Sequence, residues 1–260
     1  MNYKINSIPV NGGTADIVTL QLNEDNSLTG KNMKELDAIL AEHMKDDSKK
    51  GIILASENPK FFCNGLSASN VLAAPKEEFN NEVGGIVLLF SSLIRFSKPL
   101  IAEVSGHAMG GGAVITVSSD FKYMLDSKGR IGFTEVLVGL PLPQSFIEKI
   151  KMTVAPRYWN EVCLEGTVYK GNEAKEIGLI DATYSTVEDL RKYSVKKIES
   201  LSKIPMSAFS GTKEMLNKNL IENLPKYEKE ILESFQQPII QSNLKEAMTA
   251  LVEKRRPNLK

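Results

Sequence analysis

Three consecutive glycines stand between a predicted strand and a predicted helix in the segment Ser105–Asp120, SGHAMGGGAVITVSSD. Glycine is a poor helix former, because its unfolded backbone has the most freedom to lose. Two interpretations are open: a tight turn that needs a permissive backbone, or a site where a ligand approaches the bare N–H groups of a helix N-terminus. In the second case, fixed N–H donors would stabilise negative charge that develops on a bound oxygen.

Two further segments carry residue types that suit such chemistry. The segment Lys60–Ala68, KFFCNGLSA, follows a predicted buried strand and contains an Asn-Gly pair, which favours a turn. The segment Arg130–Pro141, RIGFTEVLVGLP, places one carboxylate, Glu135, in an otherwise apolar context. Apolar neighbours should desolvate this carboxyl and raise its pKa toward a value useful for a base near neutrality. The alternative is an exposed carboxylate at the start of a helix.

Alternating strands and helices are predicted to position these segments. The strands are expected at 16–22, 50–56, 98–106, 121–126 and 130–133, and the helices at 31–44 and 77–96. Gly84 and Gly85 interrupt the second helix. Beyond Pro143 the chain is expected to be mostly helical. This order predicts an α/β core followed by a helical C-terminal part.

The bulk composition is that of an ordinary globular protein. The chain has 260 residues, 42% hydrophobic and 25% charged, with a formal net charge of zero. This balance argues against a general affinity for nucleic acid or for an anionic membrane. The two cysteines fit a reducing compartment, and the two histidines argue against a histidine-based metal site. No segment resembles a signal peptide, a membrane span of ~20 apolar residues or a Ser-Lys-Leu terminus, so we expect a cytoplasmic protein.

In their order and spacing, the three segments resemble the crotonase superfamily of enoyl-CoA hydratases and isomerases. FFCNGLSA is similar to the family's first oxyanion-hole loop, whose usual form is Phe-x-x-Gly-Ala-Asp, and GHAMGGGAVITVSSD is similar to the second. The segment GNEAKEIGLID (Gly171–Asp181) is similar to one that the family carries after its core. The resemblance covers nearly the whole chain. It implies an α/β fold: a ClpP-like spiral of ββα units in residues 1–200 and a helical C-terminal trimerisation region in residues 201–260.

The resemblance also implies the site and its ligand. An acyl-CoA thioester oxygen would lie between the backbone N–H groups of Leu66 and Gly111, and Glu135 would be the catalytic acid and base. The residues expected to line the substrate are Asn64, Ser67, Ala68, Gly110, Val114, Thr134 and Pro143. Ser67 replaces the usual aspartate, which puts the local hydrogen bonding of this loop in question. No metal and no cofactor are expected beyond the coenzyme A thioester, and the assembly would be a homotrimer or a dimer of trimers.

The hydratases of the family use two glutamates, and this chain has only one of them. Val114 stands at the first position and Glu135 at the second. Hydration needs one group to activate water and another to handle the proton at C2, and valine does neither. Moving a double bond needs one carboxylate, which takes a proton from C2 and returns it at C4.

Two details resemble the monofunctional Δ3,Δ2-enoyl-CoA isomerases: the Gly65-Leu66 pair, and Pro143 where the hydratases have glycine. We therefore expect isomerisation of 3-enoyl-CoA to trans-2-enoyl-CoA. The alternatives are hydration with an unrecognised second acid, another enolate reaction such as decarboxylation, and a non-catalytic acyl-CoA-binding homologue.

Other conspicuous residues have simpler interpretations. His107 is expected to pack or to support a turn, and Cys63 to be a buried, inert thiol. Glu103, an unusual acid within a strand, is expected to reach the surface at an oligomer contact rather than to act in catalysis. The basic tail Glu253–Pro257 would either meet the phosphates of coenzyme A or be a solvated helix end.

Overall fold

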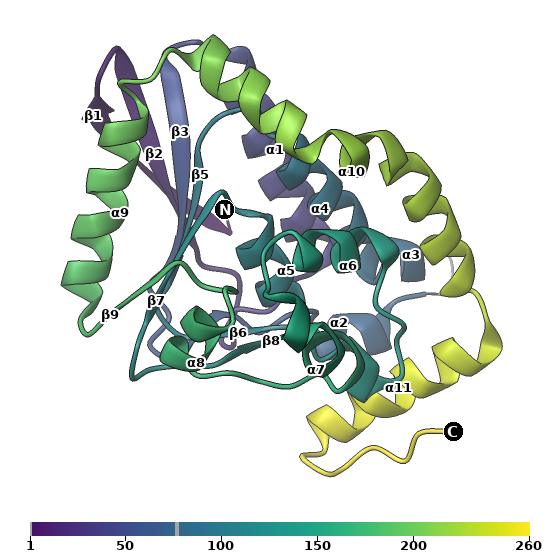
Figure 1. Ribbon diagram of the computed structural model, residues 1–260. Helices are drawn as coiled ribbons and strands as arrows, with labels where there is room; N and C mark the ends of the chain where they lie inside the picture. The colour runs from purple at the N-terminus through teal and green to yellow at the C-terminus, as the bar shows by residue number, and fades with distance from the viewer. Residues whose placement is uncertain (1, 76–77) are drawn as a thin grey trace.

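Two β-sheets and the helices packed on them make up the computed structural model, which describes residues 2–75 and 78–260 (Figure 1). The larger sheet contains, in spatial order, β1 (Tyr3–Val10), β2 (Gly13–Leu20), β3 (Lys49–Ser56), β5 (Leu100–Val104), β7 (Phe121–Leu125) and β9 (Ala182–Tyr184). Only the β1–β2 pair is antiparallel. The smaller sheet is parallel and contains β4 (Phe61–Cys63), β6 (His107–Met109) and β8 (Ile131–Gly132).

The chain repeats one pattern three times: a strand of the larger sheet, a strand of the smaller sheet, then a helix. The helices are α1 (Gly30–Lys45), α2 (Ala68–Ala73), α3 (Phe79–Glu82), α4 (Gly85–Arg95), α5 (Gly111–Ser118), α6 (Gln144–Lys151), α7 (Trp159–Leu164), α8 (Gly171–Glu176), α9 (Val187–Leu201), α10 (Met206–Ser234) and α11 (Pro238–Val252), with 3-10 turns η2 (Glu135–Val138) and η3 (Pro156–Tyr158). The three turns of the pattern are β3–β4–α2, β5–β6–α5 and β7–β8–α6, so the chain forms the expected spiral of ββα units.

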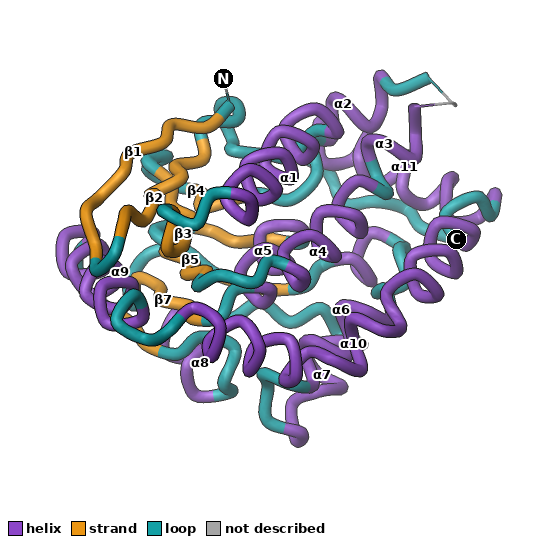
Figure 2. The backbone as a smooth tube through the Cα atoms, turned by 90° about the horizontal axis from the view of Figure 1, so that it is seen from above, coloured by secondary structure: helices purple, strands orange, loops and turns teal. Residues whose placement is uncertain are grey.

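The strands of the larger sheet are covered on both faces. On β3, Ile53 and Ala55 pack in a cluster with Ile198 of α9, whereas Ile52 and Leu54 belong to the main core on the other face. Figures 1 and 2 show α9 on one side of this sheet and α1 and α4 on the other. Burial on both faces explains why these strands are continuous apolar runs in the sequence.

The first strand, β1, was not predicted from the sequence. It is an edge strand with mostly exposed side chains, and it pairs with β2 through a turn at Asn11 and Gly12. Because little of it faces the core, it lacks the apolar alternation from which a strand is recognised.

The helix expected over 77–96 is two helices, α3 and α4, and its first residue, Glu77, lies outside the described residues. The break is at Gly84, between α3 and α4. A Cβ on Gly85 would lie 2.7 Å from Met33 Cε of α1, so this glycine allows α4 to pack closely on α1. The strand expected over 98–106 is also shorter, because the chain leaves the larger sheet after Val104 and enters the smaller one at His107.

The last two helices fold back over the rest of the chain. α10 packs against α4 and α6, and α11 packs against α2 and η2 (Figures 1 and 2). Where α11 meets the end of η2, a Cβ on Gly139 would lie 2.6 Å from Asn243 Cβ of α11, and Gly139 has a φ of +75°. Within residues 2–75 and 78–260, no helix has both the length and the apolar character needed to cross a membrane.

Candidate active site

The two glycine-bearing loops touch each other through their backbones. Gly65 has a φ of +80°, and a Cβ there would lie 2.9 Å from the carbonyl oxygen of Met109 and 3.3 Å from the amide nitrogen of Gly111. Gly110 has a φ of +49°. Both positions favour glycine: the backbone is in the left-handed region, and at Gly65 the neighbouring loop leaves no room for a side chain. The structure thus brings the two predicted loops into direct contact.

The amides of Leu66 and Gly111 are free to bind a ligand. The backbone of Leu28 bridges the first loop: its carbonyl oxygen accepts from Ser67 N–H and its N–H donates to Gly65 O, both at 2.7 Å. This parallel bridge bonds the residues before and after Leu66 and leaves the N–H of Leu66 itself unused. Gly111 is the first residue of α5, where N–H groups have no intrahelical acceptor. Neither amide donates to an acceptor in the described part of the chain. The positive end of the α5 dipole adds to the attraction for a negative oxygen.

Glu135 begins η2 directly after Thr134 and faces the turn that starts α5. A Cβ on Gly110 would lie 3.7 Å from Glu135 Oε1 and 3.6 Å from Thr134 Oγ1. The turn is held in place because Gly110 N–H donates to Gly132 O at 3.0 Å. The predicted base therefore lies beside one of the two predicted oxyanion loops.

The carboxylate of Glu135 is buried and has an unused oxygen. The residue as a whole is partly accessible, but Oε2 has almost no accessible surface and no hydrogen-bond partner among the described residues. Among the described residues, Ser145 Oγ is the one other buried side-chain oxygen without a hydrogen-bond partner. Burial raises the pKa of Glu135 to about 7. A carboxyl in this state can both accept and donate a proton near neutral pH.

Val114 lies in the interior of α5, a helix whose eight residues are all buried. Its N–H donates to Gly110 O at 3.0 Å. The side chain at this position is therefore apolar and belongs to the main core.

The other residues that were expected to line the substrate have distinct local roles. Ser67 Oγ donates to Asn70 Oδ1 at 2.9 Å, so the serine bonds to a side chain of the following helix, α2. Asn64 Nδ2 donates to Asp25 Oδ2 at 3.1 Å, which directs this side chain toward a neighbouring loop. Ala68 starts α2 and packs against the core. Pro143 is buried and precedes α6, on the segment that follows Glu135.

Sequence reasoning missed the loop that supports this region. Asn26 has a φ of +54°, and its Nδ2 donates to Ser56 Oγ at 3.0 Å and to Phe62 O at 2.8 Å. Its carbonyl oxygen accepts from Asn64 N–H at 3.3 Å. The available signal was an Asn in a polar Asn-Ser turn, since asparagine tolerates the left-handed conformation and bonds nearby backbone.

The structure shows the surroundings of three further residues that the sequence analysis singled out. Burial raises the pKa of the Cys63 thiol to about 12, which leaves it protonated and unreactive, as predicted. His107 packs its ring against Phe61, with ring centres 5.6 Å apart. The expectation for Glu103 needs correction: it does not reach the surface but makes a two-pronged ion pair with Arg191 of α9, at 2.8–3.0 Å.

In the basic tail, the Arg255 guanidinium is already paired. It contacts Glu246 at 2.5 and 3.0 Å and Glu253 at 2.6 Å. This arrangement agrees with the simpler of the two interpretations, a solvated helix end.

Comparison with known proteins identifies the family. The sequence model of the enoyl-CoA hydratase/isomerase family matches residues 12–260. Enoyl-CoA delta isomerase 3 of Arabidopsis thaliana is 29% identical over 172 residues, which cover 63% of this chain and 71% of the relative. The short-chain-enoyl-CoA hydratase of Clostridium acetobutylicum is 27% identical, over 89% of this chain and 88% of the relative.

The fold is shared with solved structures. Human mitochondrial delta3-delta2-enoyl-CoA isomerase superposes with a TM-score of 0.87 at 21% identity, covering 96% of this chain and 98% of the human one. The α/β crotonase fold, with two sheets and C-terminal helices, is thereby confirmed. Because the family model spans nearly the whole sequence, the chain belongs to the enoyl-CoA hydratase/isomerase family, the crotonase superfamily.

Proposed function

We propose that the protein isomerises 3-enoyl-CoA to trans-2-enoyl-CoA, with Glu135 as the only acid and base. Family membership implies an acyl-CoA substrate. The observation that carries the finer proposal is a buried carboxyl with an unbonded oxygen and a pKa of about 7, in a chain that has Val114 where the hydratases are expected to have their first glutamate.

In the proposed reaction Glu135 acts twice, first as a base and then as an acid. The ionised Glu135 carboxylate removes a proton from C2, and the electrons of that C–H bond form an enolate conjugated with the C3=C4 double bond. The negative charge rests on the thioester oxygen, which accepts hydrogen bonds from Leu66 N–H and Gly111 N–H. Glu135, now protonated, returns the proton at C4, and the double bond moves to C2=C3. Losing one such fixed donor typically costs about 3–4 kcal/mol of transition-state stabilisation.

Two features favour isomerisation over hydration. Val114 offers no oxygen or nitrogen with which to hold and activate a water molecule. α11 packs against η2, the segment that carries Glu135, and on that side it would limit the access of bulk water to the dienolate.

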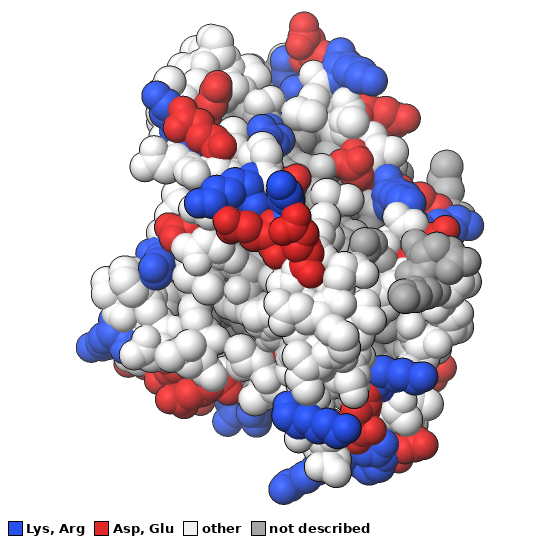
Figure 3. Space-filling view, turned by 90° about the vertical axis from the view of Figure 1, so that its right-hand side faces the viewer, with Lys and Arg blue, Asp and Glu red and all other residues white. Residues whose placement is uncertain are grey.

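We propose further that residues 1–200 carry the site and that residues 201–260 serve in trimer formation, in a cytoplasmic enzyme. An exposed apolar side chain on α10 supports this assembly, since Met215 is 67% exposed. The face in Figure 3 has Lys and Arg interspersed with Asp and Glu rather than one continuous basic patch, which favours acyl-CoA over nucleic acid as the partner.

The experiment that tests the proposal offers two substrates to the purified protein. With trans-3-hexenoyl-CoA we expect the ultraviolet absorbance of the conjugated trans-2-enoyl thioester to appear. With crotonyl-CoA we expect negligible loss of that absorbance. Rapid hydration of crotonyl-CoA would replace the isomerase proposal by a hydratase with an unrecognised second acid. No reaction with either substrate would leave another enolate reaction, such as decarboxylation, or an acyl-CoA-binding homologue.

A further inference from the structure

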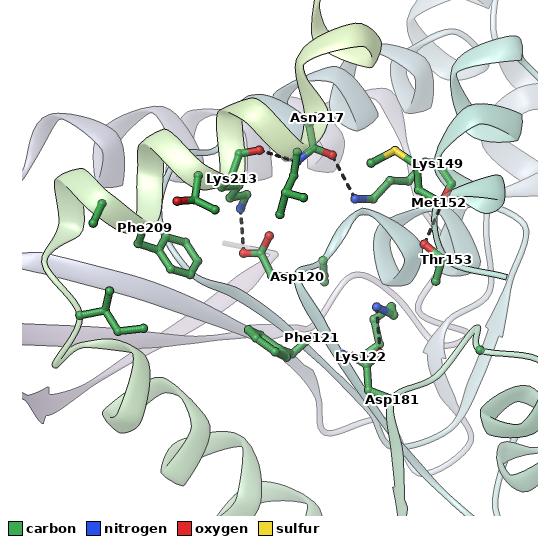
Figure 4. Close-up of a pocket in the computed structure, with 16 residues that line it drawn as sticks. Asp120, Phe121, Lys122, Lys149, Met152, Thr153, Asp181, Phe209, Lys213 and Asn217 are labelled. Carbon is green, nitrogen blue, oxygen red and sulfur yellow. Dashed lines mark hydrogen bonds and ion pairs between the residues drawn. The ribbon is translucent and has the colours of Figure 1, made fainter. Parts of the chain in front are cut away.

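A second site candidate lies at the other end of α5. A cavity of about 580 Å³ is lined by the segment that connects α5 to β7, by α6 and by the start of α10 (Figure 4). Gly111 begins α5 and Ser118 ends it, so the helix separates this cavity from the oxyanion amide by ~12 Å. A volume of this size falls in the range of small-ligand sites.

Two of the three lysines in the cavity already have a carboxylate partner. Lys213 Nζ lies 2.8 Å from Asp120 Oδ2 and donates to Lys98 O at 3.0 Å. Lys122 Nζ lies 3.3 Å from Asp181 Oδ1. These contacts balance two positive charges with two negative ones.

The third lysine, Lys149 of α6, has no carboxylate partner among the described residues. Its Nζ donates to Asn217 Oδ1 at 3.2 Å, a neutral acceptor, which leaves two of its three donors unused. Figure 4 shows the ammonium directed into the cavity, toward Asn217. Burial is the main cause that lowers the pKa of Lys149 to about 8; Asp120 raises it, and the positive charges of Lys122 and Lys213 lower it further. A largely buried cation in this state is stabilised by any anion that enters.

The walls of the cavity limit which anion fits. Phe121, Phe209 and Met152 line it, together with Ile204 and Leu216, so most of a ligand's surface would meet apolar side chains. One unpaired cation balances one negative charge. A phosphate dianion would also meet the field of Asp120 and Asp181, whereas a carboxylate carries a single charge and accepts the two donors that Lys149 has left.

We propose that this cavity binds a small carboxylic acid with an apolar body, whose carboxylate accepts hydrogen bonds from Lys149. The site is separate from Glu135 and from the oxyanion loops, and it takes a free acid rather than a thioester.

The test is titration calorimetry of the full-length protein with hexanoate near pH 7, in the presence of saturating hexanoyl-CoA to fill the acyl-CoA site. We expect Lys149→Met to weaken hexanoate binding at least ~10-fold, and Lys149→Arg to keep affinity within ~3-fold. Lys151→Met is the matched control, because Lys151 is exposed on the same helix and lies over Trp159. 1-Hexanol, which has the same apolar body without the charge, should bind at least ~10-fold more weakly than hexanoate.

The pH dependence separates Lys149 from its neighbours. Wild-type affinity should fall from about pH 7 to about pH 9, because the ammonium is lost as the pH rises through its lowered pKa. Lys149→Arg should remove this fall, because a guanidinium stays charged. If Lys213 held the carboxylate instead, the fall would persist in Lys149→Arg, because burial lowers the pKa of Lys213 as well.

Three results would overturn the proposal: no hexanoate binding by the wild type, binding that Lys149→Met leaves unchanged, or binding that hexanoyl-CoA abolishes. A fourth result is tested by sedimentation, which compares the oligomeric state of the wild type with that of Lys149→Met. If hexanoate does not bind and the variant dissociates an oligomer, the counter-ion of Lys149 is a carboxylate of a second copy of the chain. None of these readouts uses turnover, so they are independent of the isomerase proposal.

Discussion

Two buried glutamates in this chain differ in what surrounds them. Glu103, in the larger sheet, has both carboxylate oxygens bonded to Arg191. Glu135, beside the smaller sheet, has one oxygen without any partner in the described residues, and burial raises its pKa. Both are acids in an interior, yet the first is satisfied by its ion pair and the second is held in an unfavourable state. A satisfied buried charge supports the fold, whereas an unsatisfied one at a ligand site is available for chemistry.

The largest expected effect is on turnover at Glu135. Glu135→Gln should lower isomerase turnover at least ~100-fold, with acyl-CoA affinity nearly unchanged, because the amide neither accepts nor returns the proton. Initial rates with trans-3-hexenoyl-CoA and calorimetric binding of hexanoyl-CoA measure the two quantities. In the wild type, kcat/KM should rise with pH through about 7 and then level off, since the free enzyme needs the ionised base.

Glu103→Gln is the matched variant for that measurement. It should keep turnover per folded molecule within ~3-fold, because Glu103 pairs with Arg191 away from the acyl-CoA site. Comparable turnover in Glu135→Gln and a large loss in Glu103→Gln would reverse the roles assigned here.

The same two substitutions should change stability in opposite directions. Glu103→Gln should lower the free energy of unfolding by about 1–3 kcal/mol, because it leaves Arg191 without its counter-ion, although that side chain is 35% exposed and partly reaches water. Glu135→Gln should raise it above about pH 7, by at most about 3 kcal/mol, because it removes the cost of burying the ionised carboxylate.

Urea unfolding at several pH values measures both effects. The pKa of Glu135 is raised in the folded state, so its cost appears as the pH rises from the unfolded value near 4.5 to about 7 and is absent at lower pH. The advantage of Glu135→Gln over the wild type should therefore vanish in acid. An equal loss of stability in both variants at all pH values would mean that Glu135, too, is satisfied in solution.

The smallest expected effect is a gain at Val114. Val114→Glu supplies the carboxylate expected at the first glutamate position of a hydratase and should give weak but detectable hydration of crotonyl-CoA. The gain should be small, because a glutamate in this fully buried position will stay largely protonated through desolvation. The variant should also lose about 1–3 kcal/mol of stability, since an acid replaces a packed apolar side chain. Val114→Gln is the control: it adds a similar volume without an acid and should not hydrate.

Local patterns in the sequence predicted much of the fold and of the candidate site. The apolar run of β3 predicted a strand buried on both faces, and the three glycines Gly110–Gly112 indicated a permissive turn at the start of a helix, where Gly110 has a positive φ. These features depend on residues that are adjacent in the sequence, so the hydrophobic pattern and the backbone freedom of a short segment are enough to predict them. β1 was missed for the same reason, since an exposed edge strand has no such periodicity.

Only the tertiary structure decided which charges have partners. Glu103 meets Arg191 across 88 positions of sequence, and Lys149 meets Asn217 across 68. The fold-back of α11 onto η2 likewise depends on how distant helices pack. The sequence determined that Glu135 is an acid among apolar residues, but its free oxygen depends on which donors the folded chain brings near. That is a long-range property, because the free energy of a buried charge is set by every group around it in space.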